Sequence, residues 1–151
     1  MLSSVVLASL NTARAKARDA RRIEDIHQIQ NALELYYNAN GNYPSGNCDS
    51  AYNAAFPTWS ACWATLLSPY LTTMPVDPLN QYYAGSGVGG YEYSYISGQK
   101  PNGCATPTST GLLNNYVITA RLENYKSSPS GCATGFTNLW DNGAVNYIVG
   151  M

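Results

Sequence analysis

The feature that most constrains this chain is an unbroken helical stretch that begins at Leu2 and ends before Pro44. From Leu2 to Asn40 it contains neither proline nor glycine, and good helix formers such as Ala, Leu, Arg, Gln and Glu dominate it. Asn40 and Gly41 tolerate a left-handed cap, and Pro44 prevents the helix from resuming. At 1.5 Å per residue the helix is roughly 50 Å long, which is more than a domain of this size can cover.

Only the second half of this helix carries a broad apolar stripe. Its members recur at three- and four-residue steps and so share one face: Ile23, Ile26, Ile29, Leu33, Tyr36 and Tyr37. We expect Ile26, Ile29 and Leu33 to form the core between the helix and a sheet. The predicted division is a projecting helical part over residues 1–22 and a globular head over residues 23–151.

The first half of the helix lies too far along the axis to reach such a core. Val5, Val6 and Leu10 are up to about 30 Å from the stripe. We therefore expect these three side chains to be largely exposed in an isolated chain.

The rest of the chain has mainly the pattern of short strands. Four runs predict strands, at 91–96, 115–122, 144–149 and, more weakly, 81–84. In the first run Tyr91, Tyr93 and Tyr95 alternate and so point to one face. A short helix is expected over residues 59–67, and residues 45–58 are expected to form a loop. The sequence thus predicts an α+β fold in which a long N-terminal helix packs on a small antiparallel sheet.

The four cysteines predict two disulfides. They are Cys48, Cys62, Cys104 and Cys132, and they contain no C-x-x-C pair that would indicate zinc. An even number of cysteines in loop-rich sequence favours an oxidising compartment. Three pairings are open, and we predict the pairing of sequence neighbours, Cys48–Cys62 and Cys104–Cys132.

Charge is sparse and nearly balanced. The net charge is −1 and 11% of the residues are charged, so the chain as a whole has no electrostatic preference for nucleic acid or for an anionic membrane. The basic residues nevertheless concentrate in the helix: Arg14, Lys16, Arg18, Arg21 and Arg22. They spread around the helix axis, so a solvated segment is expected. The alternative is a contact with the acidic part of another copy or with lipid headgroups.

Motifs that could carry chemistry are few. The glycines of Gly85-x-Gly87-x-Gly89-Gly90 precede a predicted strand rather than a helix, so they predict a hairpin loop and not a phosphate site. His27 is the only histidine, and it lies mid-helix with no nucleophile near it in sequence. We expect His27 at the surface, no catalytic residue and no enzymatic activity.

Two stretches of the chain resemble a known superfamily. The run LSSVVLASLNTARAKARDARR, followed by I-x-x-I-x-x-I-x-x-A-L-E-L-Y-Y and the G-N-Y-P exit, closely resembles the N-terminal helix of type IV pilins and of type II secretion pseudopilins. Met74-Pro75-Val76-Asp77-Pro78 resembles the L-P-x-D-P element of pseudopilins, and its Asp77 is expected to accept hydrogen bonds in a turn. The family's mature helix begins with an aromatic residue and an apolar run. Only Met1 precedes Leu2 here, so an N-terminally truncated member is expected.

The resemblance implies a structural subunit that polymerises into an extracellular type IV pilus-like filament at the cell surface. Val5, Val6 and Leu10 would then lie in the filament core. The implied partners are other copies of the chain, a prepilin peptidase, an inner-membrane assembly platform, and the membrane that holds the subunit before assembly.

Three alternatives to this function stay open. Two belong to the same superfamily: a type II secretion pseudopilin, and a minor DNA- or surface-binding pilin, which leaves nucleic acid as an uncertain partner. The third is a free, secreted, disulfide-stapled module that binds glycans through Trp59 and Trp63.

The resemblance also raises the question of calcium, because the major pseudopilins of type II secretion bind it in the loop before their last strand. The corresponding stretch here offers one carboxylate, Asp141, followed by Asn142 and Gly143. Calcium sites use about six to eight oxygens, usually from more than one carboxylate. We therefore expect a tight turn and no cofactor, with calcium as the alternative. This departure favours a type IV pilin, in which the Cys104–Cys132 bridge replaces calcium.

Overall fold

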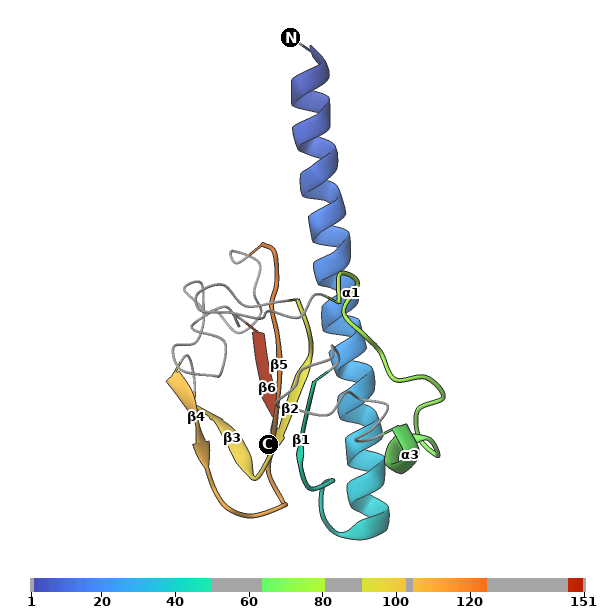
Figure 1. Cartoon of the computed structure of the whole chain (residues 1–151), viewed down its shortest axis with the longest axis vertical. Helices are drawn as coiled ribbons and strands as arrows, with labels where there is room; N and C mark the ends of the chain where they lie inside the picture. Colours follow the sequence, from blue (N-terminus) through green and yellow to red (C-terminus); the bar gives the residue numbers. More distant parts are fainter. Residues whose placement is uncertain (1, 50–63, 81–90, 103–104, 125–146, 151) are drawn as a thin grey trace.

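The computed structural model describes residues 2–49, 64–80, 91–102, 105–124 and 147–150. Its elements are, in chain order, α1 (Leu2–Asn40), β1 (Asn47–Asp49), α3 (Ala64–Leu67), β2 (Ser94–Ser97), β3 (Gln99–Asn102), β4 (Ala105–Ser109), β5 (Tyr116–Ala120) and β6 (Tyr147–Gly150). One long helix runs beside a small sheet, and the N-terminal part of the helix projects beyond it (Figure 1). The predicted α+β architecture is confirmed.

The end of α1 follows from its sequence. Gly41 has φ +75°, the left-handed conformation that a glycine adopts without strain, and its amide donates to the carbonyl of Tyr37 at 2.7 Å. The side-chain amide of Asn40 donates to the carbonyl of Tyr36 at 2.9 Å. Two carbonyls of the last turn are thereby satisfied, and the predicted C-terminus is confirmed.

The main sheet has the strand order β1-β2-β5-β6, and every neighbouring pair is antiparallel. All five residues of β5 are buried, as expected for a strand in the interior of the sheet. Tyr116, Ile118 and Ala120 belong to the core cluster that includes the residues of α1, whereas Val117 and Thr119 alternate with them toward the other face.

A second sheet consists of the hairpin β3–β4, which lies farther from α1 than the main sheet does (Figure 1). Its register shifts between Lys100 and Asn102, where Pro101 interrupts the strand. Pro101 and Pro107 cannot donate to a ladder, so a short, irregular hairpin outside the main sheet suits them.

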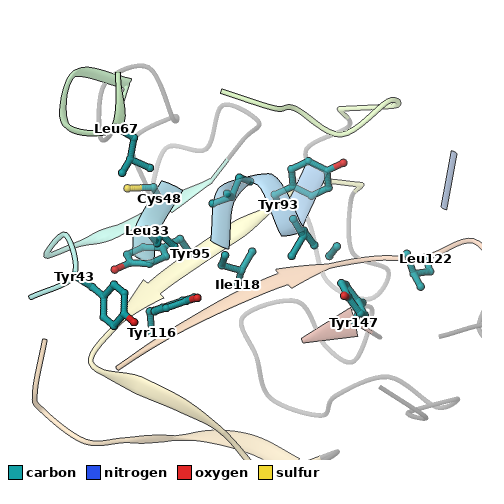
Figure 2. Packing of buried hydrophobic residues seen from close by; sticks show 13 residues of the cluster. Leu33, Tyr43, Cys48, Leu67, Tyr93, Tyr95, Tyr116, Ile118, Leu122 and Tyr147 are labelled. Carbon is teal, nitrogen blue, oxygen red and sulfur yellow. The ribbon is translucent and has the colours of Figure 1, made fainter. Parts of the chain in front are cut away.

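The core lies between α1 and the main sheet (Figure 2). Ile26, Ile29 and Leu33 are fully buried there and share one cluster with tyrosines from β2, β5, β6 and the adjoining segments. The buried tyrosines of the cluster are Tyr43, Tyr93, Tyr95, Tyr116 and Tyr147. Because a buried phenol needs a partner for its hydroxyl, several of these rings also hold the chain together through hydrogen bonds. The hydroxyl of Tyr95 donates to the carbonyl of Pro44 at 2.7 Å, and that of Tyr43 donates to Glu34 at 2.9 Å.

The structure departs from the sequence-based prediction in two places. Residues 45–58 were expected to form a loop, but Asn47–Asp49 pairs with β2 as the strand β1. The hairpin β3–β4 was not predicted, because its polar residues and two prolines show no alternating apolar pattern. In both places pairing with a neighbouring segment, rather than the segment's own pattern, makes the strand.

Other predicted elements are only partly described. β2 begins at Ser94 rather than Tyr91, and β5 is shorter than the predicted 115–122. α3 and β6 are the described ends of the predicted helix 59–67 and strand 144–149, and β6 continues to Gly150. The weaker predicted strand 81–84 lies outside the described residues.

Candidate functional site

The projecting part of α1 is the first candidate site. Leu7 is 60% exposed and Leu10 is 43% exposed, although both are large apolar side chains. Val5 and Val6 belong to the same helix, but their side chains lie outside the described residues. Exposed apolar side chains on a helix that points away from its own core indicate a surface that another molecule covers.

Arg22 holds α1 to the head at the base of this projection. We call Arg18, Asp19 and Arg22, together with their partners Asp77 and Glu123, the anchor. Its guanidinium is fully buried and pairs with Asp77 through two bonds, Nε to Oδ2 at 2.6 Å and Nη2 to Oδ1 at 3.1 Å. Its Nη1 also donates to Asp19 at 2.7 Å and to Glu123 at 2.8 Å. Burial would lower the pKa of Arg22, but the hydrogen bonds that Arg22 donates to Asp77 and Glu123 outweigh it and raise the pKa, so the group stays charged.

Arg18 and Asp19 extend this anchor along the helix. Arg18 binds Glu123 through Nε to Oε1 at 2.7 Å and Nη2 to Oε2 at 2.6 Å. The carboxylate of Asp19 accepts from the backbone amides of Glu123 and Asn124, both at 2.9 Å. Hydrogen bonds from Arg18 hold the pKa of Glu123 below its ordinary value, although burial opposes them. The segment that follows β5 is thus fixed to α1 by ionic contacts from successive turns.

Asp77 has two roles in the structure. Its Oδ1 accepts from the amides of Leu79 at 2.8 Å and Asn80 at 3.3 Å, which confirms the predicted turn acceptor. Asn80 adopts φ 42° in this turn, a conformation that asparagine tolerates better than most residues. The two flanking prolines, Pro75 and Pro78, leave this segment no helical alternative, so the carboxylate is presented rigidly to Arg22.

Aromatic rings complete the surroundings of the anchor. The ring of Tyr91 lies between two guanidinium groups, with its centroid 4.7 Å from Arg22 and 4.9 Å from Arg121. One turn further along α1, Asp25 accepts a hydrogen bond of 2.9 Å from the hydroxyl of Tyr93. Burial raises the pKa of Asp25 and of Tyr93, and the hydrogen bond between them raises the pKa of Tyr93 further.

The structure therefore corrects the expectation that the five basic residues of α1 form a solvated segment. Arg14, Lys16 and Arg21 are exposed, but Arg22 is fully buried and Arg18 is partly so. A signal for this was present in the sequence. Arg22 lies four residues before Ile26, and Asp19 lies three residues before Arg22, so both continue the apolar stripe. A charge on a buried stripe requires a buried partner.

The remaining predicted residues are distributed as follows. His27 is exposed. Cys48 is fully buried and disulfide-bonded. The residues that lie outside the described part are Cys62, Cys104, Cys132, Trp59, Trp63, the glycines from Gly85 to Gly90, and Asp141, Asn142 and Gly143. The disulfide pairing, the glycan-binding and calcium alternatives and the division at residue 22 thus stay predictions, although the described hydrogen bonds from α1 to the head begin at Arg18.

The side chains of the anchor are not arranged for catalysis. Asp19, Asp77 and Glu123 face arginines, so their oxygens are occupied by guanidinium and amide donors. Within the described residues no three His, Cys, Asp or Glu side chains are arranged to hold a metal ion. In the same part of the chain, no helix is both long and apolar enough to cross a membrane.

Comparison with known proteins identifies the family. The family model for the type II secretion system (T2SS) protein G matches residues 7–103, which is more than half of the chain. The chain belongs to this family. It is a pilin- or pseudopilin-type structural subunit, and the matched range contains the exposed Leu7 and Leu10 as well as the Arg22–Asp77 pair. No curated protein and no solved structure matches the chain.

Proposed function

We propose that this protein is a filament subunit that polymerises through the exposed half of α1. The observation that carries the proposal is a continuous helix whose second half contributes Ile26, Ile29 and Leu33 to its own core, whereas its first half presents Leu7 and Leu10 to solvent. Burying large apolar side chains is favourable by about 1.5–3 kcal/mol each, so parallel packing of several copies stabilises an assembly. Membership of the protein G family supports the same role.

The anchor suits a subunit that is held by one end. A force on the projecting helix passes to the head through the base of α1, where Arg18 and Arg22 bind Glu123 and Asp77 with paired hydrogen bonds. Bidentate charge-assisted bonds are directional and strong. The head therefore keeps a fixed orientation on the helix, which is what a regular filament requires of each subunit.

The filament that we propose is a type IV pilus-like structure at the cell surface. The single carboxylate of the Asp141-Asn142-Gly143 stretch supports this choice over a calcium-dependent pseudopilus. The proposed partners are other copies of the chain, a prepilin peptidase, an inner-membrane platform and, before assembly, the membrane itself. A cell-surface filament also suits a disulfide-bonded head.

A second candidate is a pseudopilus of a type II secretion system, and the description of the matching family favours it. The two candidates differ in where the polymer lies and in what its loss does. A pilus-like filament is visible outside the cell, whereas a pseudopilus is needed for the export of other proteins.

Electron microscopy of filaments sheared from the source cell, combined with mass spectrometry of their subunits, tests the proposal. We expect this chain as a filament component, and we expect protein export to be unchanged when its gene is deleted. Normal surface filaments without this chain, together with loss of export on deletion, would select the pseudopilus. Recovery of the chain only as a free protein in the medium would contradict both candidates.

A further inference from the structure

The connection between β4 and β5 presents a second exposed apolar surface. We call residues 110–115 the leucine loop, since Leu112 is 58% exposed and Leu113 is 38% exposed within it. The loop is fixed at both ends by the backbone. The amide of Thr110 donates to Gly98 at 2.7 Å, and that of Gly98 donates to Asn115 at 2.8 Å. Exposed leucines on a fixed loop, outside the core that the described residues form, indicate a contact surface.

The leucine loop and the projecting part of α1 lie at opposite ends of the molecule (Figure 1). The amide of Tyr43 donates to the carbonyl of Leu113 at 2.8 Å, which places the loop beside the exit of α1. Leu7 and Leu10 lie near the other end of the same helix. The two apolar surfaces therefore cannot meet within one copy, but they can meet between copies.

The two surfaces match in charge as well as in apolar character. The loop sequence Thr-Gly-Leu-Leu-Asn-Asn carries no charge, and neither does the segment of α1 from Leu7 to Ala13. Contact between them thus removes no charged group from water. Next to the segment, Arg14 and Lys16 are exposed, and the last turn of α1 beside the loop contains no basic residue. When the helix of a second copy docks on the loop, its Arg14 and Lys16 come near the partly negative C-terminal end of α1 of the first copy.

We propose that the leucine loop of one copy docks on the Leu7–Ala13 segment of α1 of a second copy. This inference rests on the proposed function, because it names one contact by which the exposed helix is covered. The contact is heterologous, because it joins two different surfaces. A copy that uses one of its two surfaces in such a contact still has the other surface free. Such a contact propagates into an open polymer instead of closing into a dimer.

Photo-crosslinking in filaments from cells that make the full-length protein tests this contact. A benzophenone amino acid replaces Leu112, and the matched control carries it in place of Leu35, which is 50% exposed on α1. We expect position 112, and not position 35, to crosslink to the tryptic peptide that contains residues 7–13 and ends at Arg14. Crosslinks from position 112 only to other peptides, or none, would overturn the inference.

Filament yield gives an independent readout. Leu112→Gln should reduce it about tenfold, the effect expected from losing one buried leucine side chain. Leu35→Gln should leave it within about twofold, since that residue has no proposed contact. Both variants should keep the melting temperature of the unsubstituted protein. An unchanged melting temperature would show that the head still folds.

Wild-type yield for Leu112→Gln with loss of filaments for Leu10→Gln would refute the docking and leave the proposed function standing. Wild-type yield for both would refute the proposed function.

Discussion

Arg22 is a charged side chain at a core position, and its neighbours determine whether that is tolerable. A buried guanidinium is costly without partners, but here Asp77, Asp19 and Glu123 occupy its donors. The same carboxylates depend on the guanidinium. Removing one partner of such a buried group leaves the others uncompensated, which is more harmful than losing a surface ion pair.

We therefore predict that Arg22→Ala lowers the free energy of unfolding by about 3–5 kcal/mol. Arg22→Lys should recover only part of the loss, because an ammonium group cannot form the two parallel bonds to Asp77. Arg14→Ala is the matched control, since Arg14 is exposed on the same helix, and it should change the free energy by less than about 0.5 kcal/mol. Urea denaturation of the three variants measures these changes in the free energy of unfolding. Equal midpoints for Arg22→Ala and Arg14→Ala would show that the network does not hold the helix.

The acid range tests Glu123. Its pKa in the folded protein is lowered, mainly by the hydrogen bonds from Arg18, relative to an ordinary value of about 4.3. The ionised group thus stabilises the fold above that value, and the contribution is lost as the pH falls through the lowered pKa. Below about pH 4.3 the unfolding midpoint should fall more steeply for the wild type than for Glu123→Gln. Glu24→Gln is the control, because it removes an exposed carboxylate that lies near the anchor on the same helix. Parallel curves for wild type and Glu123→Gln would contradict the assignment.

Among the secondary-structure elements, α1 contributes side chains to two surfaces, one buried against the sheet and one exposed. Leu33 is fully buried against the sheet, whereas Leu10 is 43% exposed. Leu33→Ala should cost about 2–5 kcal/mol of unfolding free energy in the isolated protein. Leu10→Ala should cost less than about 0.5 kcal/mol. Thermal unfolding followed by circular dichroism compares the two. If Leu10→Ala lowers the melting temperature as much as Leu33→Ala, the N-terminal half of α1 packs on its own head and does not project.

The strand β1 and the predicted helix 59–67 are expected to be joined by a disulfide. Cys48 is buried and disulfide-bonded in β1. We predict that its partner is Cys62 and that Cys104 pairs with Cys132. Peptide mapping without reduction identifies the pairs directly. A Cys48–Cys104 or Cys48–Cys132 peptide would contradict the predicted pairing.

For the whole molecule, the long helix and the strands with an apolar pattern could be predicted from the sequence, whereas β1 and the hairpin β3–β4 could not. The helix from Leu2 to Asn40 was predictable because many residues repeat one pattern and Gly41 supplies its end. β1 has three residues, too few to show a period, and it exists because it pairs with β2. The anchor is hard to predict for a related reason. Its helix residues belong to a basic segment that spreads around the helix axis, and the partners of Arg22, Asp77 and Glu123, lie 55 and 101 residues away from it in the sequence.

The structure of the filament, determined by electron cryomicroscopy, tests whether the exposed half of α1 is an assembly surface. We predict that Leu10, which is 43% exposed in the single chain, is buried against neighbouring copies, while Ile26, Ile29 and Leu33 keep their contacts with their own sheet. A filament in which heads alone make the contacts and Leu7 and Leu10 stay in solvent would contradict the account.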